Sequence, residues 1–260
     1  MNRESLSTTD QAEAFEEAPI QRWRWLRPLL PKALQPYLRG WRKQLELRQL
    51  SLEEPFRSIY PFTQVSQGRL ENLAQLTERI ESEGVVGDIV ECGVLDGGSA
   101  ALMAYATRDT NRKIHLFDAW KGLPPSGVED GESAKKWSGQ VVGSPERVRA
   151  IMRKMKIPPE RVVFHQGWFS DTFPKAEIER IALLHIDADF YESVKLCLET
   201  WSPKVSKDGY IQLDDYSAFK GCRRAVDEFL AQNPGMTLIA HKDAYYIPVA
   251  QIGKESATRE

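Results

Sequence analysis

The chain has 260 residues, of which 42% are apolar and 28% charged, a size and composition that suit one soluble α/β domain with an extension. The formal net charge of −2 gives no argument for nucleic acid as a partner, and no run of about 18 apolar residues could span a membrane. The three cysteines lack CxxC spacing, so we expect reduced core thiols in a cytoplasmic protein and no structural zinc.

The N-terminal region differs in composition from the rest of the chain. Residues 1–18 are polar and acidic, unlike a signal peptide, and predict a disordered tail. Residues 19–67 are expected to form a helical or lid extension. Within it, residues 19–50 are rich in Arg, Lys, Leu and Trp and contain one acid, Glu46. Such a stretch suits a peripheral membrane contact, or helices packed on the main domain or across a dimer interface. The proline spacing breaks any long helix and favours the packed helices.

From residue 68 to about residue 250, helical and strand patterns alternate. Helices are expected over 68–83, 97–109, 144–157 (with Ser144 as N-cap), 192–205 and 221–235. Strands are expected over 87–94, 113–120, 161–169, 181–187 and 209–215, and residues 236–250 can pair as two strands around Lys242–Asp243. The alternation predicts one α/β domain over 68–250, with a doubly wound, mostly parallel seven-stranded sheet and an antiparallel edge. A tail follows at 251–260.

The turn after the first expected strand is rich in glycine, in "ECGVLDGGSA", residues 91–100. Glycines at such a turn let the backbone approach a ligand, and the following helix offers free amides. The spacing is not that of a dinucleotide fingerprint, and no lysine follows Gly98 as it would in a triphosphate-binding loop. Asp118 ends the next strand, where an acid can accept hydrogen bonds from ribose hydroxyls; its alternative role is to cap the following turn. Together these features favour a ligand with a ribose and no required polyphosphate.

Two later strands also end in acids. "HIDADFYES" has Asp187 and Asp189, and "GYIQLDDYS" has Asp214 and Asp215. Because neighbouring parallel strands end at the same edge of a sheet, these carboxylates can converge, and they repel unless protonated or bridged by a cation. Oxygen ligands without His or Cys suit Mg²⁺ or Ca²⁺ better than Zn²⁺.

We therefore expect Asp187, Asp214 and Asp215 to bind a hard cation, although Asp215 could instead cap the turn before Phe219. Asp189 is expected to cap the helix that starts near Tyr191. His185 lies in an apolar run and is expected to be a hydrogen-bonded core histidine.

These motifs, together with "IHLFDAWKGLP" and "GWFSDTFP", resemble the macrocin and mycinamicin sugar O-methyltransferase family and, more distantly, catechol-type O-methyltransferases. Five motifs occur in the family's order between about residues 69 and 248. The resemblance implies a class I methyltransferase fold, S-adenosylmethionine and Mg²⁺ as cofactors, a glycoside or polyol substrate, and a homo-oligomer. It also implies cofactor contacts, with the methionine and ribose end beside Glu91, Gly93, Gly97 and Ser99, the ribose hydroxyls on Asp118, and the adenine by Trp168 and Asp171.

The resemblance implies methylation of a sugar hydroxyl on a natural product or polysaccharide. Catechol-type enzymes have a lysine where this chain has Phe190, so Asp187 is the first candidate for the general base, before Asp189 or a loop acid. Three alternatives stay open: an O-methyltransferase for a catechol or other small diol, a Mg²⁺-dependent phosphoesterase, and a non-catalytic binding protein.

Two segments outside these motifs are candidates for contact with the ligands. The loop 121–143 is long, polar and glycine-rich, as lids often are, and its candidates to touch the acceptor are Glu129, Asp130 and Trp137. Around the start of the first regular helix, the methionine carboxylate or the lid could be reached by Thr63, Ser66 and Arg69. Arg69 could equally be a surface residue at the start of that helix.

Overall fold

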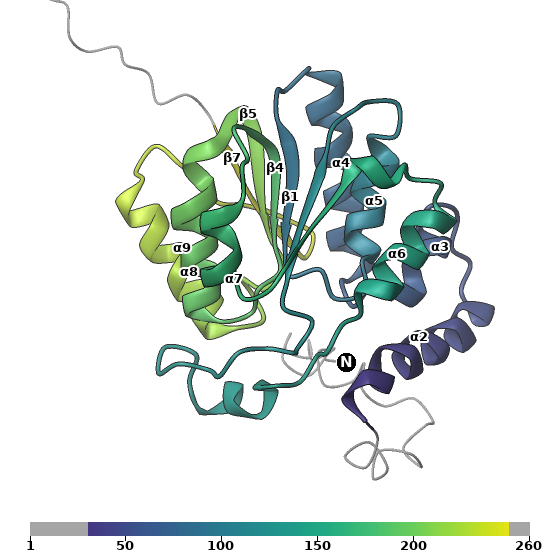
Figure 1. Ribbon diagram of the computed structural model, residues 1–260. Coiled ribbons are helices and arrows are strands. Elements are labelled where there is room, and N and C mark those ends of the chain that lie inside the picture. The colour runs from purple at the N-terminus through teal and green to yellow at the C-terminus, as the bar shows by residue number, and fades with distance from the viewer. Residues whose placement is uncertain (1–30, 250–260) are drawn as a thin grey trace, which may run out of the picture.

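A seven-stranded sheet forms the centre of residues 31–249, the part of the chain that the structure, a computed structural model, describes (Figure 1). The expected tails at 1–18 and 251–260, and residues 19–30 of the extension, lie outside the described residues. The strands are β1 (Asp88–Cys92), β2 (Ile114–Asp118), β3 (Val162–Gln166), β4 (Ile181–Ile186), β5 (Val205–Leu213), β6 (Ile239–His241) and β7 (Ala244–Val249).

The strand order is β3-β2-β1-β4-β5-β7-β6. Strands β1 to β5 pair in parallel, whereas β7 pairs antiparallel with both β5 and β6. The predicted doubly wound sheet and its antiparallel edge are therefore confirmed, although β5 begins at Val205, before the predicted residue 209. The order reverses between β1 and β4, and ligands of such sheets bind beyond the carboxyl ends of the strands at this switch point.

The central strands are apolar because helices cover both faces of the sheet. All six residues of β4 are buried, the pattern expected of a strand without a solvent face. The cysteines Cys92, Cys197 and Cys222 are free and buried in this core, as expected.

Helices α4, α5 and α6 pack on one face of the sheet, and α7, α8 and α9 on the other (Figure 1). The helices are α2 (Gln35–Glu46), α3 (Phe56–Ile59), α4 (Gln67–Ser82), α5 (Gly98–Ala106), α6 (Pro145–Lys154), α7 (Phe169–Thr172), α8 (Tyr191–Trp201) and α9 (Lys220–Gln232). The five predicted helices are confirmed, and Ser144 caps α6 by accepting a hydrogen bond from the Arg147 amide. The strand predicted over 161–169 is too long, because the chain turns at Gly167 (φ 150°) and α7 follows.

The described part of the N-terminal extension packs on the main domain through α2. Arg39 on this helix forms an ion pair of 2.7 Å with the buried Asp96, and Lys43 donates a hydrogen bond to the Thr63 carbonyl. The outer face of α2, together with Leu34 just before it, exposes the apolar residues Leu34, Tyr37, Leu38 and Trp41. Within residues 31–249, no helix is long and apolar enough to cross a membrane.

Candidate active site

A cavity of about 570 Å³ opens at the carboxyl ends of β1, β2, β4 and β5, a size typical of small-molecule sites. Its floor includes Gly93, Asp118 and the acids that follow β4 and β5. The loop 121–143 contributes a second wall through Leu123, Pro124, Pro125, Gly127, Asp130, Trp137 and Val141. The cavity therefore lies where the switch point of the sheet predicts a ligand.

The acids Asp187, Asp214 and Asp215 meet at the floor of this cavity. One carboxylate oxygen from each lies within 4.8 Å of the others. The sheet hydrogen bonding runs on into these residues, because the Asp187 amide donates to the Cys92 carbonyl and the Asp214 amide to the Ile186 carbonyl. Burial, followed by repulsion from the neighbouring acids, raises the pKa of Asp187 well above its usual value and that of Asp215 to about 7.

The cluster has the properties of a cation site. The donors are all carboxylate oxygens, which suit a hard divalent ion. Oδ1 of Asp214 is buried and has no hydrogen-bond partner among residues 31–249, which is costly for a carboxylate unless a cation approaches it. These residues therefore fit the expected Mg²⁺.

Arg69, near the start of α4, reaches the same cluster. Its Nη1 donates to the carbonyl of Asp214 at 2.9 Å and also forms an ion pair of 2.5 Å with Oδ2 of that residue. The sequence suggested Arg69 for the methionine carboxylate or the lid, and the contact with Asp214 was missed. One arginine among three carboxylates leaves an excess of negative charge.

A buried histidine lies beneath the acids. Nδ1 of His185 is 2.9 Å from Oε1 of Glu91, and its Nε2 is 3.9 Å from Oδ1 of Asp214. Burial alone would lower the pKa of His185, but the nearby carboxylates of Asp214 and Glu91 outweigh burial and raise it to about 9. His185 is a core residue, as expected, but its link to the acid cluster could not be inferred from the strand pattern.

Asp118 is held by the glycine-rich turn. Its Oδ2 accepts from the amides of Val94 and Leu95, both at 2.9 Å, and its Oδ1 accepts from the Trp120 amide at 2.6 Å. The residue thus makes the turn contacts of the alternative role and also lines the cavity. A carboxylate oxygen has two lone pairs, so Oδ1 retains one for a ligand.

Gly93 is required by the close approach of two strand ends. It has φ 89°, and a Cβ built on it would lie 1.7 Å from the carbonyl oxygen of Asp187. A side chain here would push the end of β1 away from the end of β4. The glycine predicted for ligand approach therefore also brings Asp187 to the switch point.

The cavity separates the expected cofactor residues into two groups. Gly93, Asp118 and Trp168 line it. Four residues do not line the cavity formed within residues 31–249: Glu91, Gly97, Ser99 and Asp171. Asp171 is exposed on α7, whereas Glu91 and Ser99 are buried behind the wall.

The expected capping role of Asp189 is wrong. The first amide of α8, that of Tyr191, donates to Oδ1 of Asp130 in the loop 121–143 at 2.8 Å, so a distant residue fills the capping position. Asp189 has a left-handed backbone (φ 55°), its amide donates to Oδ2 of Asp215, and the residue lines the cavity.

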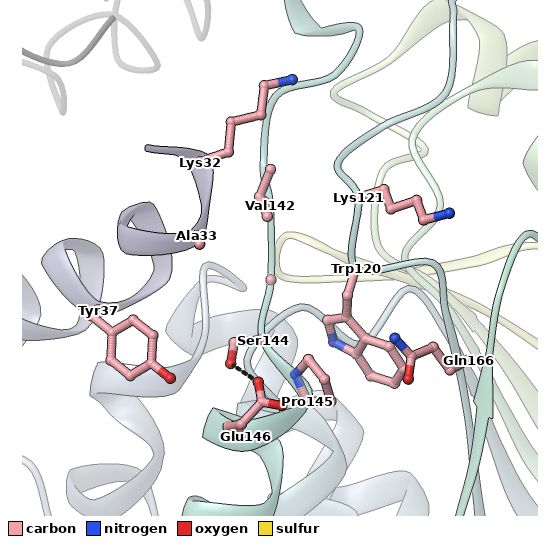
Figure 2. Close-up of a pocket in the computed structure, with 11 residues that line it drawn as sticks. Lys32, Ala33, Tyr37, Trp120, Lys121, Val142, Ser144, Pro145, Glu146 and Gln166 are labelled. Atoms are coloured by element: carbon pink, nitrogen blue, oxygen red, sulfur yellow. Dashed lines mark hydrogen bonds between the residues drawn. The ribbon is translucent and has the colours of Figure 1, made fainter. Parts of the chain in front are cut away.

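A second hollow, also of about 570 Å³, lies between the start of α2 and the outgoing arm of the loop 121–143. Figure 2 shows Lys32 and Tyr37 on the α2 side and Trp120 and Gln166 across from them. Of the described residues that line it, Glu146 is the one acid, and it accepts a hydrogen bond from Ser144. Because the three-acid cluster lies in the first cavity, we place the active site there.

Residues 16–245 match the macrocin-O-methyltransferase (TylF) family. The chain belongs to this family. It is thus an S-adenosylmethionine-dependent O-methyltransferase, as the motifs predicted, and the phosphoesterase and binding-protein alternatives are set aside. The match begins at residue 16 and so includes the whole N-terminal extension, most of which the motifs did not cover.

The chain is similar to two enzymes from Streptomyces. It is 37% identical over 175 residues to 8-demethyl-8-(2,3-dimethoxy-alpha-L-rhamnosyl)-tetracenomycin-C 4'-O-methyltransferase from Streptomyces olivaceus, which covers 64% of this chain and 67% of the relative. It is 38% identical over 181 residues to demethyldecarbamoylnovobiocin O-methyltransferase from Streptomyces niveus, with coverage of 65% and 68%. The solved structure of the O-methyltransferase NovP superimposes with a TM-score of 0.70 and 30% identity, over 85% of this chain and 100% of that one. The class I methyltransferase fold is therefore confirmed.

Proposed function

We propose that this enzyme uses Mg²⁺ to methylate a sugar hydroxyl of a glycoside, on a natural product or a polysaccharide. The observation that carries the proposal is the cluster of three carboxylates on the wall of a cavity in a macrocin-type O-methyltransferase. Two relatives support a glycoside acceptor. One is named for a rhamnosyl substrate, and another, 32% identical over 179 residues, is mycinamicin III 3''-O-methyltransferase from Micromonospora griseorubida.

Asp187, Asp214 and Asp215 would hold the Mg²⁺. Their convergence and the unpartnered Oδ1 of Asp214 within residues 31–249 support this assignment. Bound Mg²⁺ lowers the pKa of a hydroxyl that contacts it. Arg69 keeps Asp214 in place through its carbonyl and its carboxylate.

Gly93, Asp118 and Trp168 would contact the methyl donor, because they line the same cavity. Asp118 would accept the ribose hydroxyls, held in position by three backbone amides. S-adenosylmethionine, when bound, supplies a methyl group on a positively charged sulfur. Three expected contact residues would act indirectly, by fixing the end of β1 and the turn after it: Glu91, Gly97 and Ser99. Asp171 would lie outside the cavity, near the adenine.

Two carboxylates are candidates for the base that takes the proton of the acceptor hydroxyl. Asp187 is the first, because it lies at the switch point. Asp189 is the second, because it lines the cavity and does not belong to the three-carboxylate cluster. Asp187→Asn should lose Mg²⁺ binding together with turnover, whereas Asp189→Asn should lose turnover and keep Mg²⁺ binding if Asp189 is the base. Calorimetry with MgCl₂ confirms that Asp189→Asn still binds the metal, and the turnover of this variant then decides between the two assignments.

We propose further that residues 68–250 form the methyltransferase domain, that 19–67 form its extension, and that the chain self-associates through the extension. The exposed apolar residues Leu34, Tyr37, Leu38 and Trp41 on α2 support an interface between copies. Light scattering of the full chain should give at least a dimer, and Trp41→Glu should reduce the mass. A monomer that floats with anionic liposomes would instead support the peripheral membrane contact through residues 19–50.

The acceptor class can be tested with purified full-length protein, S-adenosylmethionine and MgCl₂. A panel of rhamnosides and other glycosides with neighbouring free hydroxyls should gain one CH₂ per molecule by mass spectrometry. The Asp214→Ala variant is the negative control, and small catechols are the comparison set. Methylation of catechols without any methylated glycoside would overturn the sugar assignment.

A further inference from the structure

Asp130 in the loop 121–143 occupies an unusual position for an acid in a surface loop. Its side chain is buried, with 4% exposure. Its Oδ1 accepts from the amide of Tyr191, the first residue of α8, at 2.8 Å, and its Oδ2 accepts from the Gly127 amide at 2.7 Å. Both carboxylate oxygens are thus bound to backbone, which leaves Asp130 poorly suited to the acceptor contact suggested by the sequence.

The start of α9 leaves space for this carboxylate. A Cβ built on Gly221 would lie 1.7 Å from Oδ1 of Asp130 and 2.8 Å from the Tyr191 nitrogen. Asp130 therefore lies at the N-termini of both α8 and α9, where free amides and the helix dipoles favour a negative charge. These helices follow the loops that contain Asp187 and the Asp214–Asp215 pair.

A second residue of the loop packs at the same place. Trp137 makes an edge contact with Phe219, the residue before α9, at 6.4 Å between ring centres, and Phe219 in turn contacts Phe190, the residue before α8. The outer part of the loop is thus attached to α8 and α9 by one carboxylate and one aromatic ring.

The base of the loop is held separately. The Leu123 amide donates to the Gln140 carbonyl and the Gly139 amide to the Leu123 carbonyl, which closes the loop beneath residues 124–138. The outgoing arm is also fixed to the N-terminal extension, by Lys32 just before α2 on the Gly139 carbonyl and by Arg39 of α2 on the Val142 carbonyl. Figure 2 shows Lys32 on the α2 side and Val142 on the arm. Loss of the Asp130 contacts should therefore release residues 124–138 and leave the base in place.

We infer that Asp130 is a positioning residue that holds residues 124–138 over the acceptor side of the active-site cavity by capping α8 in the space left by Gly221. The inference rests on the proposed function only for the identity of the acceptor. If the closed loop is the form that binds the acceptor, the apparent affinity falls with the fraction of closed loop. Saturating acceptor should restore closure, so the KM should rise while kcat changes little.

The test compares Asp130→Ala with Glu132→Gln, which alters an exposed acid of the same loop that pairs with Lys135. Hydrogen exchange of the full-length proteins without substrates should speed up about tenfold in residues 124–138 of Asp130→Ala, with residues 139–143 and the melting temperature little changed. The acceptor KM should rise roughly tenfold, the size expected for a lost helix cap. Glu132→Gln should behave as the unmodified protein. Unchanged exchange over 124–138 in a folded Asp130→Ala protein would overturn the inference.

A second variant tests the same contact from the helix side. Gly221→Ala should displace the carboxylate and raise exchange in 124–138, and its effect should be smaller when Asp130 is already alanine. If Gly221→Ala raises exchange over 124–138 equally with and without the Asp130→Ala change, the effect comes from α9 itself and the role of Asp130 is refuted. If the exchange changes occur but no glycoside is methylated even by the unmodified protein, the proposed acceptor fails and the inference about Asp130 stands.

Discussion

Two groups of acids at the same edge of the sheet differ in what surrounds them. Asp118, the last residue of β2, accepts hydrogen bonds from three backbone amides. The cluster of Asp187, Asp214 and Asp215, after β4 and β5, has mainly Arg69 and the Asp189 amide as partners. A carboxylate that the backbone already satisfies can hold a neutral hydroxyl, whereas close carboxylates without enough donors require a cation. The partners of an acid, more than its position after a strand, therefore indicate which ligand it serves.

The largest effect that this contrast predicts is that of Asp214→Ala. Turnover should fall by about 10³-fold or more, since a catalytic metal contributes several kcal/mol, and calorimetry should detect no tight Mg²⁺ site. Affinity for S-adenosylhomocysteine should stay within about threefold, because Asp118 is untouched. The matched control is Glu199→Ala, an exposed acid near the far end of α8. Full turnover of Asp214→Ala in the presence of a chelator would end the metal assignment.

The converse change, Asp118→Ala, should weaken donor binding and spare the metal. Loss of hydrogen bonds to a charged group costs about 1.5–3 kcal/mol, which corresponds to roughly a 10- to 100-fold weaker affinity for S-adenosylhomocysteine. Mg²⁺ affinity should change little. Because three amides also lose their acceptor, the melting temperature should be measured alongside, and Asp118→Asn serves as the milder variant. Equal losses of donor and metal binding would break the contrast between the two groups of acids.

The acid cluster should also make the metal-free protein less stable as the pH rises. The pKa of Asp215 is about 7 in the folded protein and 3.8 ordinarily, so between about pH 4 and pH 7 the folded state binds more protons than the unfolded state. Stability is therefore greatest below that window and falls as the pH rises through it. In chelator, the melting temperature should drop by several degrees from pH 5 to pH 7.5, and Mg²⁺ should reverse much of the loss.

The variant Asp215→Asn supplies the control for this pH dependence, because it removes the titrating group and lowers the repulsion in the cluster. Its melting temperature in chelator should depend less on pH. An unmodified protein that becomes more stable from pH 5 to pH 7.5 in chelator would show that the carboxylates are not crowded as described.

The smallest predicted difference concerns the adenine end. Trp168 lines the cavity and Asp171 is exposed outside it. Stacking of a base on an aromatic ring contributes about 1–3 kcal/mol. The lower end of that range corresponds to roughly fivefold in affinity, so Trp168→Ala should weaken S-adenosylhomocysteine binding at least that much. Asp171→Ala should stay within about twofold. A larger effect of Asp171→Ala would show that the adenine reaches beyond the present wall.

The sequence allowed prediction of features with local signals. Apolar runs that end in acids identified β4, β5 and the cluster, and helical periodicity identified five helices, because burial of one face is written in residues close along the chain. The family motifs added the donor and the reaction type. The short helix α7 was missed because four residues are too few to show a period.

The contacts that sequence reasoning missed join residues far apart in the chain. Arg69 meets Asp214, His185 meets Glu91, and Asp130 caps α8 at Tyr191. None has a local pattern, since each depends on how loops and strand ends are brought together by the sheet. The sequence points to Asp189 as the cap, yet the N-cap position of α8 is Phe190 and the Tyr191 amide donates to Asp130.

The backbone hydrogen bonds between Leu123 and the pair Gly139–Gln140 make the loop above them a separately closed segment. Because these hydrogen bonds close the base of the loop, residues 124–138 can be replaced by a segment of different length or composition at a modest loop-closure cost. The acids at the strand ends are unchanged by such a replacement, because they lie outside residues 124–138. Chimeras that graft this segment between relatives would then transfer acceptor preference without rebuilding the donor pocket.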